Sequence, residues 1–259
     1  MDVALLPGAE RIAALQAEER QQKDNLCGCF WGSLVLRAHG FTEVDQDDVA
    51  VRAGSLLPHP SDEDVPPGAR PRQDYRLPIP VVDDHDVTGT GEPGLARAIA
   101  ELSGGALAAV PAAGPWTADS VLALFAAAEE HGAVLVANVR TGCFWGSRAP
   151  VYSLLEALAG RTVAGPPPDW DVGHFVTLAG LARGPGGALV LVGDTYQELG
   201  WRGYYLQPAA AVAAALERGD GREGGVLCVL PAPAEGGFRD GLAASGLDLR
   251  HWDNGTPDR

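Results

Sequence analysis

The order of helical and strand patterns along the chain predicts an α+β fold. Helical patterns fill residues about 8–131 and strand patterns fill about 132–230, without the strand–helix alternation typical of a parallel sheet. The turn-forming run 183–187 stands between two apolar runs, which indicates a hairpin and therefore antiparallel pairing. We expect one domain over residues 1–230, with helices packed on an antiparallel sheet, followed by a weakly ordered tail over 231–259.

The helices of the first half are expected from apolar periodicity and from end signals. The helix over 29–38, with Cys27 and Gly28 at its N-terminus, is apolar along its length and is expected to be buried. Gly54 and Gly132 stop later helices at positions that favour a left-handed residue. The expected helices cover residues 8–20, 29–38, 45–54, 94–102 and 117–131.

The strands of the second half are expected from short apolar runs. These runs cover residues 133–139, 174–181, 188–194, 204–206 and 226–230, and an Ala-rich helix is expected over 209–217. Two long segments, 55–93 and 143–173, contain proline clusters and are expected to be inserted surface loops. Loops of this length often cover or narrow a binding site.

Composition and charge limit the classes of function. The chain of 259 residues is 46% apolar and has a formal charge of −15, which argues against nucleic acid or an anionic membrane as a partner. No run approaches about 18 apolar residues, and no basic segment precedes an apolar one at the N-terminus. The four cysteines do not form a disulfide framework, so free thiols are expected. The sequence therefore predicts a cytoplasmic protein with no nucleic-acid and no membrane partner.

Cys27 is the first candidate for chemistry. At the N-terminus of a buried helix, the helix dipole and unpaired N–H groups favour the thiolate and lower the thiol pKa from about 8.5. The hairpin supplies candidate partners, because a turn centred near Gly184 places His174 opposite Asp194, within reach for a carboxylate to hold an imidazole. A thiol, a base and a group that orients the base are the elements of nucleophilic catalysis.

These residues resemble the papain-like cysteine peptidases, and most closely the bacteriocin leader (double-glycine) peptidases and their stand-alone relatives. Gln21 lies six residues before Cys27, His174 opens a later strand and Asp194 ends the next. The run 89–99 is similar to the Gly-Thr element that precedes the second helix in that branch.

The resemblance extends over about residues 15–230 and implies a papain-like fold. It implies that Cys27 attacks a carbonyl carbon and that His174 exchanges protons while Asp194 orients it. It also implies that Gln21 stabilises the oxyanion together with the backbone N–H of the cysteine.

Cys29 is an alternative nucleophile, because papain has Cys-Gly-x-Cys-Trp with the second cysteine catalytic, and residues 27–31 offer both thiols. Six residues before Cys29 stands Lys23, which cannot replace a neutral amide donor, so the spacing from Gln21 favours Cys27.

The hexapeptide Gly-Cys-Phe-Trp-Gly-Ser occurs twice, at 28–33 and at 142–147. One interpretation is convergent apolar packing, and the other is that the second copy lines the same cleft. The candidate substrate-binding residues are Phe144, Trp145, Cys29, Trp31 and Trp170.

The resemblance implies a thiol-dependent hydrolase, a peptidase or amidase, that forms an acyl-thioester and acts on a peptide or small amide, such as a peptide or natural-product precursor. Two alternatives are an acyltransferase or peptide cyclase on the same scaffold, and a catalytically inert binding protein. We expect no cofactor and no metal, because no second Cys/His pair with metal-ligand spacing accompanies Cys27 and Cys29. The sequence makes no prediction of oligomeric state.

Overall fold

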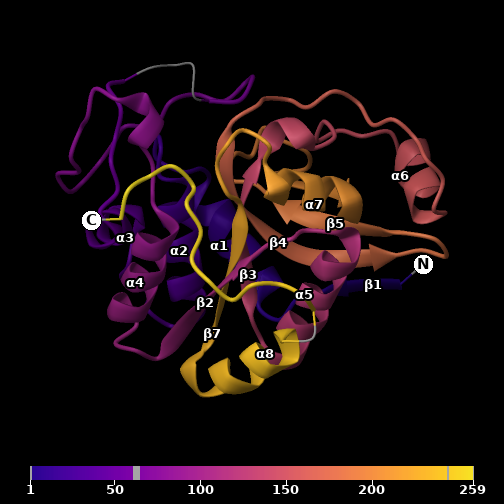
Figure 1. Ribbon diagram of the computed structural model, residues 1–259. Coiled ribbons are helices and arrows are strands. Elements are labelled where there is room, and N and C mark those ends of the chain that lie inside the picture. Colours follow the sequence, from indigo (N-terminus) through magenta and orange to yellow (C-terminus); the bar gives the residue numbers. More distant parts are fainter. Residues whose placement is uncertain (1, 61–64, 244, 259) are drawn as a thin grey trace.

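The computed structural model describes residues 2–60, 65–243 and 245–258, which form a seven-stranded sheet with helices on both faces (Figure 1). The strand order is β2-β7-β3-β4-β5-β6, and β1 pairs with β4 beyond the part of β4 that pairs with β3. Every pairing is antiparallel, so the α+β class is confirmed. The strands are β1 (Asp2–Leu5), β2 (Leu107–Ala113), β3 (Val134–Arg140), β4 (Gly173–Arg183), β5 (Ala188–Gly193), β6 (Tyr204–Pro208) and β7 (Gly225–Pro231).

The helices begin and end largely where the sequence signals lie. Asp45 caps α3 through a capping box with Asp48, and Thr117 caps α5 in the same way with Ser120. Gly54 and Gly132 follow these two helices with φ values of 72° and 71°, where glycine avoids a Cβ penalty. The α-helices among the described residues are α1 (Ala9–Glu19), α2 (Cys27–Ala38), α3 (Gln46–Ala53), α4 (Glu92–Leu102), α5 (Ala118–His131), α6 (Val151–Leu158), α7 (Ala209–Glu217) and α8 (Glu235–Leu242).

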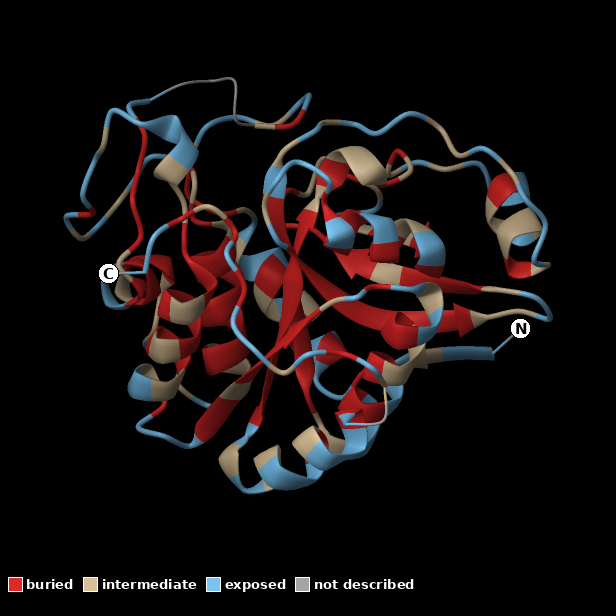
Figure 2. Cartoon of the chain, in the orientation of Figure 1, coloured by how far each residue is buried: buried red, intermediate tan, exposed pale blue. Residues whose placement is uncertain are grey.

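The central strands are buried on both faces (Figure 2). In β3, Leu135 and Ala137 belong to the core shared with α5, α7 and α8, whereas Val134 and Val136 belong to the core shared with α2, α3 and α4. The molecule therefore has three layers, with the sheet between two sets of helices. This burial explains why β3 is a continuous apolar run in the sequence, since neither face of the strand meets water.

Three segments differ from what the sequence predicts. The part expected to be helical contributes β2 to the sheet, where it pairs with β7. The segment 143–173, expected to be a loop, contains α6. The segment 231–259, expected to be a weakly ordered tail, contains α8 and the buried Trp252, although Ala244 and Arg259 lie outside the described residues. The other expected loop, 55–93, is mostly irregular, and its residues 61–64 are not among those described.

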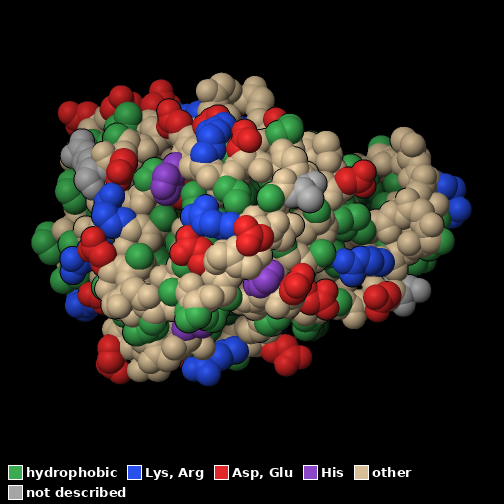
Figure 3. Space-filling view, turned by 60° about the horizontal axis from the view of Figure 1, so that its bottom comes forward, with side chains coloured by type: hydrophobic (Ala, Val, Ile, Leu, Met, Phe, Trp, Pro, Cys, Tyr) green, Lys and Arg blue, Asp and Glu red, His purple; other side chains and the backbone are tan. Residues whose placement is uncertain are grey.

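Acidic side chains outnumber basic ones in the chain, 34 against 19. On the face shown in Figure 3 the two kinds lie interspersed, so charges of opposite sign are neighbours on that face. Within the described part of the chain, no helix combines the length and the apolar character that a membrane span requires.

Candidate active site

Cys27 is the first residue of α2 and is half-buried. The N-cap residue Leu26 has no side-chain hydrogen bond to the first turn, and the sulfur receives the backbone N–H of Gly28. A Cβ atom on Gly28 would lie 3.2 Å from the ring of Phe175, which follows His174 in β4. Glycine at position 28 therefore allows α2 to approach β4 and bring the thiol beside His174.

His174 lies at the start of β4 and is 2% exposed. Its Nε2 atom lies 3.1 Å from Oδ1 of Asp194 and 3.3 Å from the hydroxyl of Thr195. The imidazole is also close enough to the sulfur of Cys27 for the two groups to shift each other's pKa. Because Asp194 and Thr195 contact Nε2, Nδ1 is the ring nitrogen left for the thiol.

The strand register that we expected for this pair is wrong. β4 pairs Arg183 with Ala188, so the centre of the hairpin lies beyond Gly184, and a β-bulge shifts the register again nearer the site. His174 and Asp194 are therefore not cross-strand partners. Their side chains still meet, because Asp194 directly follows β5 and reaches across to the start of β4.

Asp194 is fully buried, and both of its carboxylate oxygens accept hydrogen bonds. Oδ1 accepts the backbone N–H of Tyr196 at 3.3 Å as well as the contact with His174, and Oδ2 accepts the hydroxyl of Tyr205 at 3.0 Å. These bonds fix the carboxylate in one orientation, which in turn fixes the imidazole plane.

The thiol and the imidazole shift each other's protonation in the direction that favours an ion pair. Burial alone would raise the pKa of Cys27, but the hydrogen bond and positive charge of His174, with the N–H groups of Phe175 and Gly28, lower it below its ordinary value. Burial alone would lower the pKa of His174, but the charge and hydrogen bond of Asp194, with a smaller contribution from Cys27, raise it to about 10. Both shifts favour a thiolate beside an imidazolium.

Two aromatic rings enclose the imidazole. Trp170 meets His174 edge-on with ring centroids 5.0 Å apart, and Tyr196 stacks on it at 6.2 Å with an interplanar angle of 23°. Trp170, a candidate from the sequence, also lines the cavity that opens on Cys27. The two rings shield the imidazole from solvent.

The structure separates the two neighbouring glutamines. Gln21 donates its side-chain amide to the carbonyl of Arg70 at 2.8 Å and does not line the cavity that contains Cys27. Gln22 is 4% exposed and does line that cavity. The hydroxyl of Thr195 donates to its Oε1 at 2.6 Å. Of the two glutamines, Gln22 is therefore the one that lies on the cavity wall with Cys27.

Cys29 and Trp31 lie in the core beneath α2. Cys29 is fully buried, with its sulfur 3.3 Å from the Ser55 hydroxyl and 3.2 Å from that of Thr90, and burial raises its pKa to about 12. Trp31 is also fully buried and donates its indole N–H to the carbonyl of Phe175 at 3.0 Å. Neither residue lines the cavity, so neither contacts a substrate there.

No residue of the second copy of the hexapeptide lines the cavity, although Gly142 packs against Asp171 of the cavity wall. Phe144 is 5% exposed and packs edge-on against Tyr205 with ring centroids 6.2 Å apart. The backbone of Trp145 exchanges two hydrogen bonds with the side chain of Gln207, at 2.8 and 2.7 Å. Neither aromatic residue lines the cavity. The structure thus favours packing as the reason for the repeat, and Phe144 supports the tyrosine that holds Asp194.

The cavity that opens on Cys27 and His174 has a volume of about 300 Å³. Its wall includes polar residues that the sequence did not single out, because they come from β3, the segment before β4, the chain after α7 and the C-terminal segment. The buried Arg218 donates to Asn138 at 2.8 Å and pairs with Asp220 at 2.7 Å. The wall residues of this kind include Asn138, Arg140, Asp171, Arg218, Arg222, Asn254 and Thr256.

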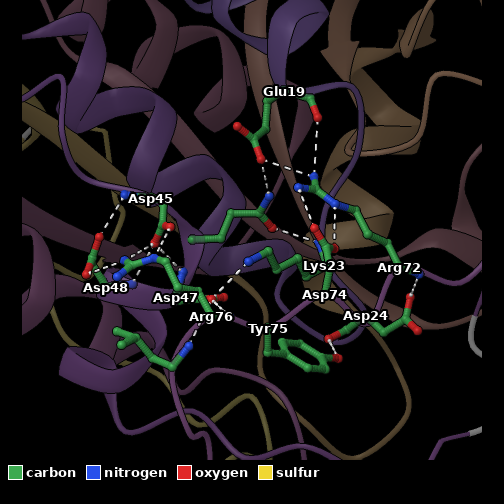
Figure 4. Close-up of polar contacts among 12 residues, drawn as sticks. Glu19, Lys23, Asp24, Asp45, Asp47, Asp48, Arg72, Asp74, Tyr75 and Arg76 are labelled. Atoms are coloured by element: carbon green, nitrogen blue, oxygen red, sulfur yellow. Dashed lines mark hydrogen bonds and ion pairs between the residues drawn. The ribbon is translucent and has the colours of Figure 1, made fainter.

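The loop before Cys27 is held by a polar network (Figure 4). Lys23, the one lysine of the chain, forms a buried ion pair with Asp47 of α3 at 2.9 Å. Arg72 donates to the carbonyl of Gln21 at 2.7 Å, and its backbone N–H donates to Asp24 at 2.9 Å. These contacts fix residues on both sides of Gln22 and so fix the position of its amide.

One protein family, described as a family of unknown function (DUF6885), matches residues 6–253 of the chain. The chain therefore belongs to this family. No curated protein shows significant similarity to the chain. Within the described residues, no group of three or more His, Cys, Asp and Glu side chains is placed to hold a metal ion.

Proposed function

We propose that the protein is a thiol-dependent acyl hydrolase, a peptidase or amidase, in which Cys27 is the nucleophile, His174 the acid and base, and Asp194 the group that orients His174. One observation carries the proposal: Cys27 and His174 lie on the wall of one cavity and shift each other's pKa, and His174 is hydrogen-bonded to Asp194. A thiol-bearing helix packed against an antiparallel sheet that supplies the base also agrees with the resemblance to papain-like peptidases.

The reaction follows from the protonation states. The Cys27 thiolate attacks the carbonyl carbon of an amide, and the tetrahedral oxyanion accepts the N–H of Cys27 and the Nε2–H of Gln22. The His174 imidazolium donates its proton to the leaving nitrogen, the C–N bond breaks and a thioester with Cys27 remains. Neutral His174 then takes a proton from water, which attacks the thioester and releases the acid and the thiol.

The position of Gln22 supports this assignment of the oxyanion donor. The Oε1 atom of Gln22 accepts the hydrogen bond from the Thr195 hydroxyl. The amide nitrogen is therefore the end of the side chain that remains to donate to a substrate. Thr195 also contacts Nε2 of His174, which links the oxyanion donor to the triad through one hydroxyl.

The test is acylation by p-nitrophenyl acetate, an activated ester that does not require the natural substrate. We expect rapid p-nitrophenol release and an acetyl group on Cys27 by peptide mass spectrometry, with Cys143 of the same molecule as the internal reference thiol. Cys143 is a suitable reference because it is half-buried and burial raises its pKa. Cys27→Ser should abolish the reaction, whereas Cys29→Ser should leave it within about twofold because Cys29 is buried away from the cavity.

Two outcomes separate the alternatives. Acetylation of Cys27 no faster than that of Cys143 identifies an inert binding protein and overturns the proposal. If Cys27 is acylated, adding a primary amine distinguishes a hydrolase, which still forms acetate, from an acyltransferase, which forms the acetamide in preference to acetate.

A further inference from the structure

A second cavity adjoins the first at the N-terminal end of α2. Its volume is about 280 Å³, close to the 300 Å³ of the catalytic cavity. Asn25 lines both cavities, and it stands two residues before Cys27. Its backbone is left-handed, with φ of 59°, a conformation that asparagine tolerates better than most residues. The two cavities thus adjoin each other within one short turn of the proposed nucleophile.

The two cavities differ in chemistry. The second is lined mainly by apolar side chains from two stretches of the segment 55–93, among them Leu57, Tyr75, Ile79 and Val81. The catalytic cavity carries the guanidinium groups of Arg140, Arg218 and Arg222 with their carboxylate partners. The catalytic cavity also has apolar wall residues, Trp170, Val172 and Phe175, but the wall of the second cavity is mainly apolar. An apolar group therefore gains more from burial in the second cavity.

The second cavity is built by hydrogen bonds that hold its two stretches together. The N–H of Leu57 donates to the carbonyl of Pro80, and the N–H of Val82 donates to the carbonyl of Leu57, both at 2.9 Å. The hydroxyl of Tyr75 donates to the carbonyl of Asp24 at 2.9 Å, which attaches this wall to the loop before Cys27 (Figure 4). A wall fastened in this way keeps the cavity open without a ligand.

The position of His174 indicates which part of a substrate reaches the second cavity. The leaving group must lie beside His174, because this residue protonates it. The acyl part must then lie on the other side of Cys27. His174 lines only the catalytic cavity, whereas the second cavity is reached past Asn25.

We propose that the cavity formed by residues 57–60 and 73–81 is the acyl-group subsite of this protein, and that it binds an uncharged apolar chain or side chain on the acyl side of the scissile bond. This inference rests on the proposed function. It narrows the substrate class to acyl donors with an apolar chain of about the length of a leucine side chain or longer, and it assigns a role to the long segment inserted between α3 and α4.

The test compares p-nitrophenyl acetate with p-nitrophenyl octanoate. In each case the Cys27 thiolate attacks the ester carbonyl, the C–O bond breaks, p-nitrophenolate leaves and an acyl-thioester forms. Each rate is divided by that of N-acetylcysteine with the same ester to remove differences in intrinsic reactivity. Burial of the chain should raise kcat/KM by about fourfold per methylene until the cavity is filled. We expect a preference of at least about tenfold for octanoate.

Val81→Asp tests the cavity itself. Val81 is 51% exposed, so a carboxylate there changes the wall with little loss of buried packing. We expect this variant to lose at least about tenfold in kcat/KM for the octanoyl ester and less than about twofold for the acetyl ester. Val51→Asp is the matched control, because Val51 is 50% exposed, lies on α3 and lines neither cavity. It should change neither rate.

The outcomes distinguish failure of the subsite from failure of the proposed function. Cys27-dependent cleavage with no preference for octanoate, or an equal loss on both esters in Val81→Asp, overturns the subsite alone. Absence of Cys27-dependent cleavage overturns the proposed function. In that case titration calorimetry of octanamide with Cys27→Ser tests separately whether the second cavity binds an apolar chain. Binding that is lost when Val81→Asp is added supports the subsite, and absence of binding overturns it.

Discussion

The Nε2 atom of His174 lies 3.1 Å from Oδ1 of Asp194, and this contact holds the imidazole in its charged form. The carboxylate raises the pKa of His174 to about 10 although burial acts in the opposite direction. The charged ring in turn helps to lower the pKa of Cys27. The contact between His174 and Asp194 therefore acts, through the imidazole, on the pKa of the Cys27 thiol.

The first prediction concerns the pH dependence of Cys27 alkylation by iodoacetamide, which reacts with the thiolate. Because the pKa of Cys27 is lowered, thiolate is present above a midpoint that lies below the ordinary value of 9.0, and reactivity is lost as the pH falls through that midpoint. His174→Ala removes the main lowering contribution and leaves burial, so the midpoint should move above 9.0. Peptide mass spectrometry across pH gives both midpoints. An unchanged midpoint in His174→Ala would contradict the thiolate–imidazolium pair.

The second prediction concerns the tyrosine that holds Asp194. Tyr205→Phe removes the donor to Oδ2 of a fully buried carboxylate, which should lower the free energy of unfolding by about 1–3 kcal/mol. Tyr204→Phe is the matched control, because the Tyr204 hydroxyl is buried and has no hydrogen-bond partner among the described residues. Removing that hydroxyl should leave stability unchanged or raise it. Urea unfolding of the two variants gives the comparison, and equal losses would show that the bond to Asp194 adds nothing.

The third prediction separates the neighbouring glutamines. Gln22→Ala should lower kcat by about 10²–10³-fold, the loss typical of one oxyanion donor, with a smaller effect on KM. Gln21→Ala should stay within about twofold, because its amide bonds to Arg70 outside the cavity. Steady-state rates of p-nitrophenyl acetate cleavage measure both. A larger loss of kcat in Gln21→Ala than in Gln22→Ala would favour Gln21 as the oxyanion donor, the assignment that its spacing to Cys27 suggested.

The sequence was sufficient for features that depend on local chemistry. The glycine stops at Gly54 and Gly132 are predicted from turn preferences alone, and the structure has them at those residues. The ranges predicted for these two helices, 45–54 and 117–131, begin at the residues that cap them, Asp45 and Thr117. The contact between His174 and Asp194 was also expected, but from a register that the structure does not have. A bulge and the position of a hairpin turn depend on tertiary packing, so counting residues could not place them.

Two further differences between prediction and structure arise where the path of the backbone determines which residues lie at the cavity. Gln21 and Gln22 are chemically identical neighbours, so residue type alone could not show that Gln22, and not Gln21, lies on the cavity wall with Cys27. The repeated hexapeptide is helical at 28–33, within α2, but spans a 3₁₀ turn and irregular chain at 142–147. Identical sequence therefore carried no information about shared position, because tertiary context overrides local preference.

The last prediction concerns the buried ion pair between Lys23 and Asp47. The two side chains are 7% and 0% exposed, so Lys23→Met removes the cation of a buried ion pair and leaves the Asp47 carboxylate with the backbone N–H groups of Arg76 and Leu77. We expect the free energy of unfolding to fall by about 3 kcal/mol, the lower end of the range for a broken buried pair. Arg52→Met is the control, because Arg52 and its ion-pair partner Glu101 have side chains that are 55% and 46% exposed. Loss of this exposed ion pair should lower the free energy of unfolding by less than about 1 kcal/mol. Urea unfolding measures both variants. Since Lys23 follows Gln22, we also expect Lys23→Met to lower kcat for p-nitrophenyl acetate even where the variant is fully folded. A variant as stable and as active as the wild type would show that this ion pair does not position the loop.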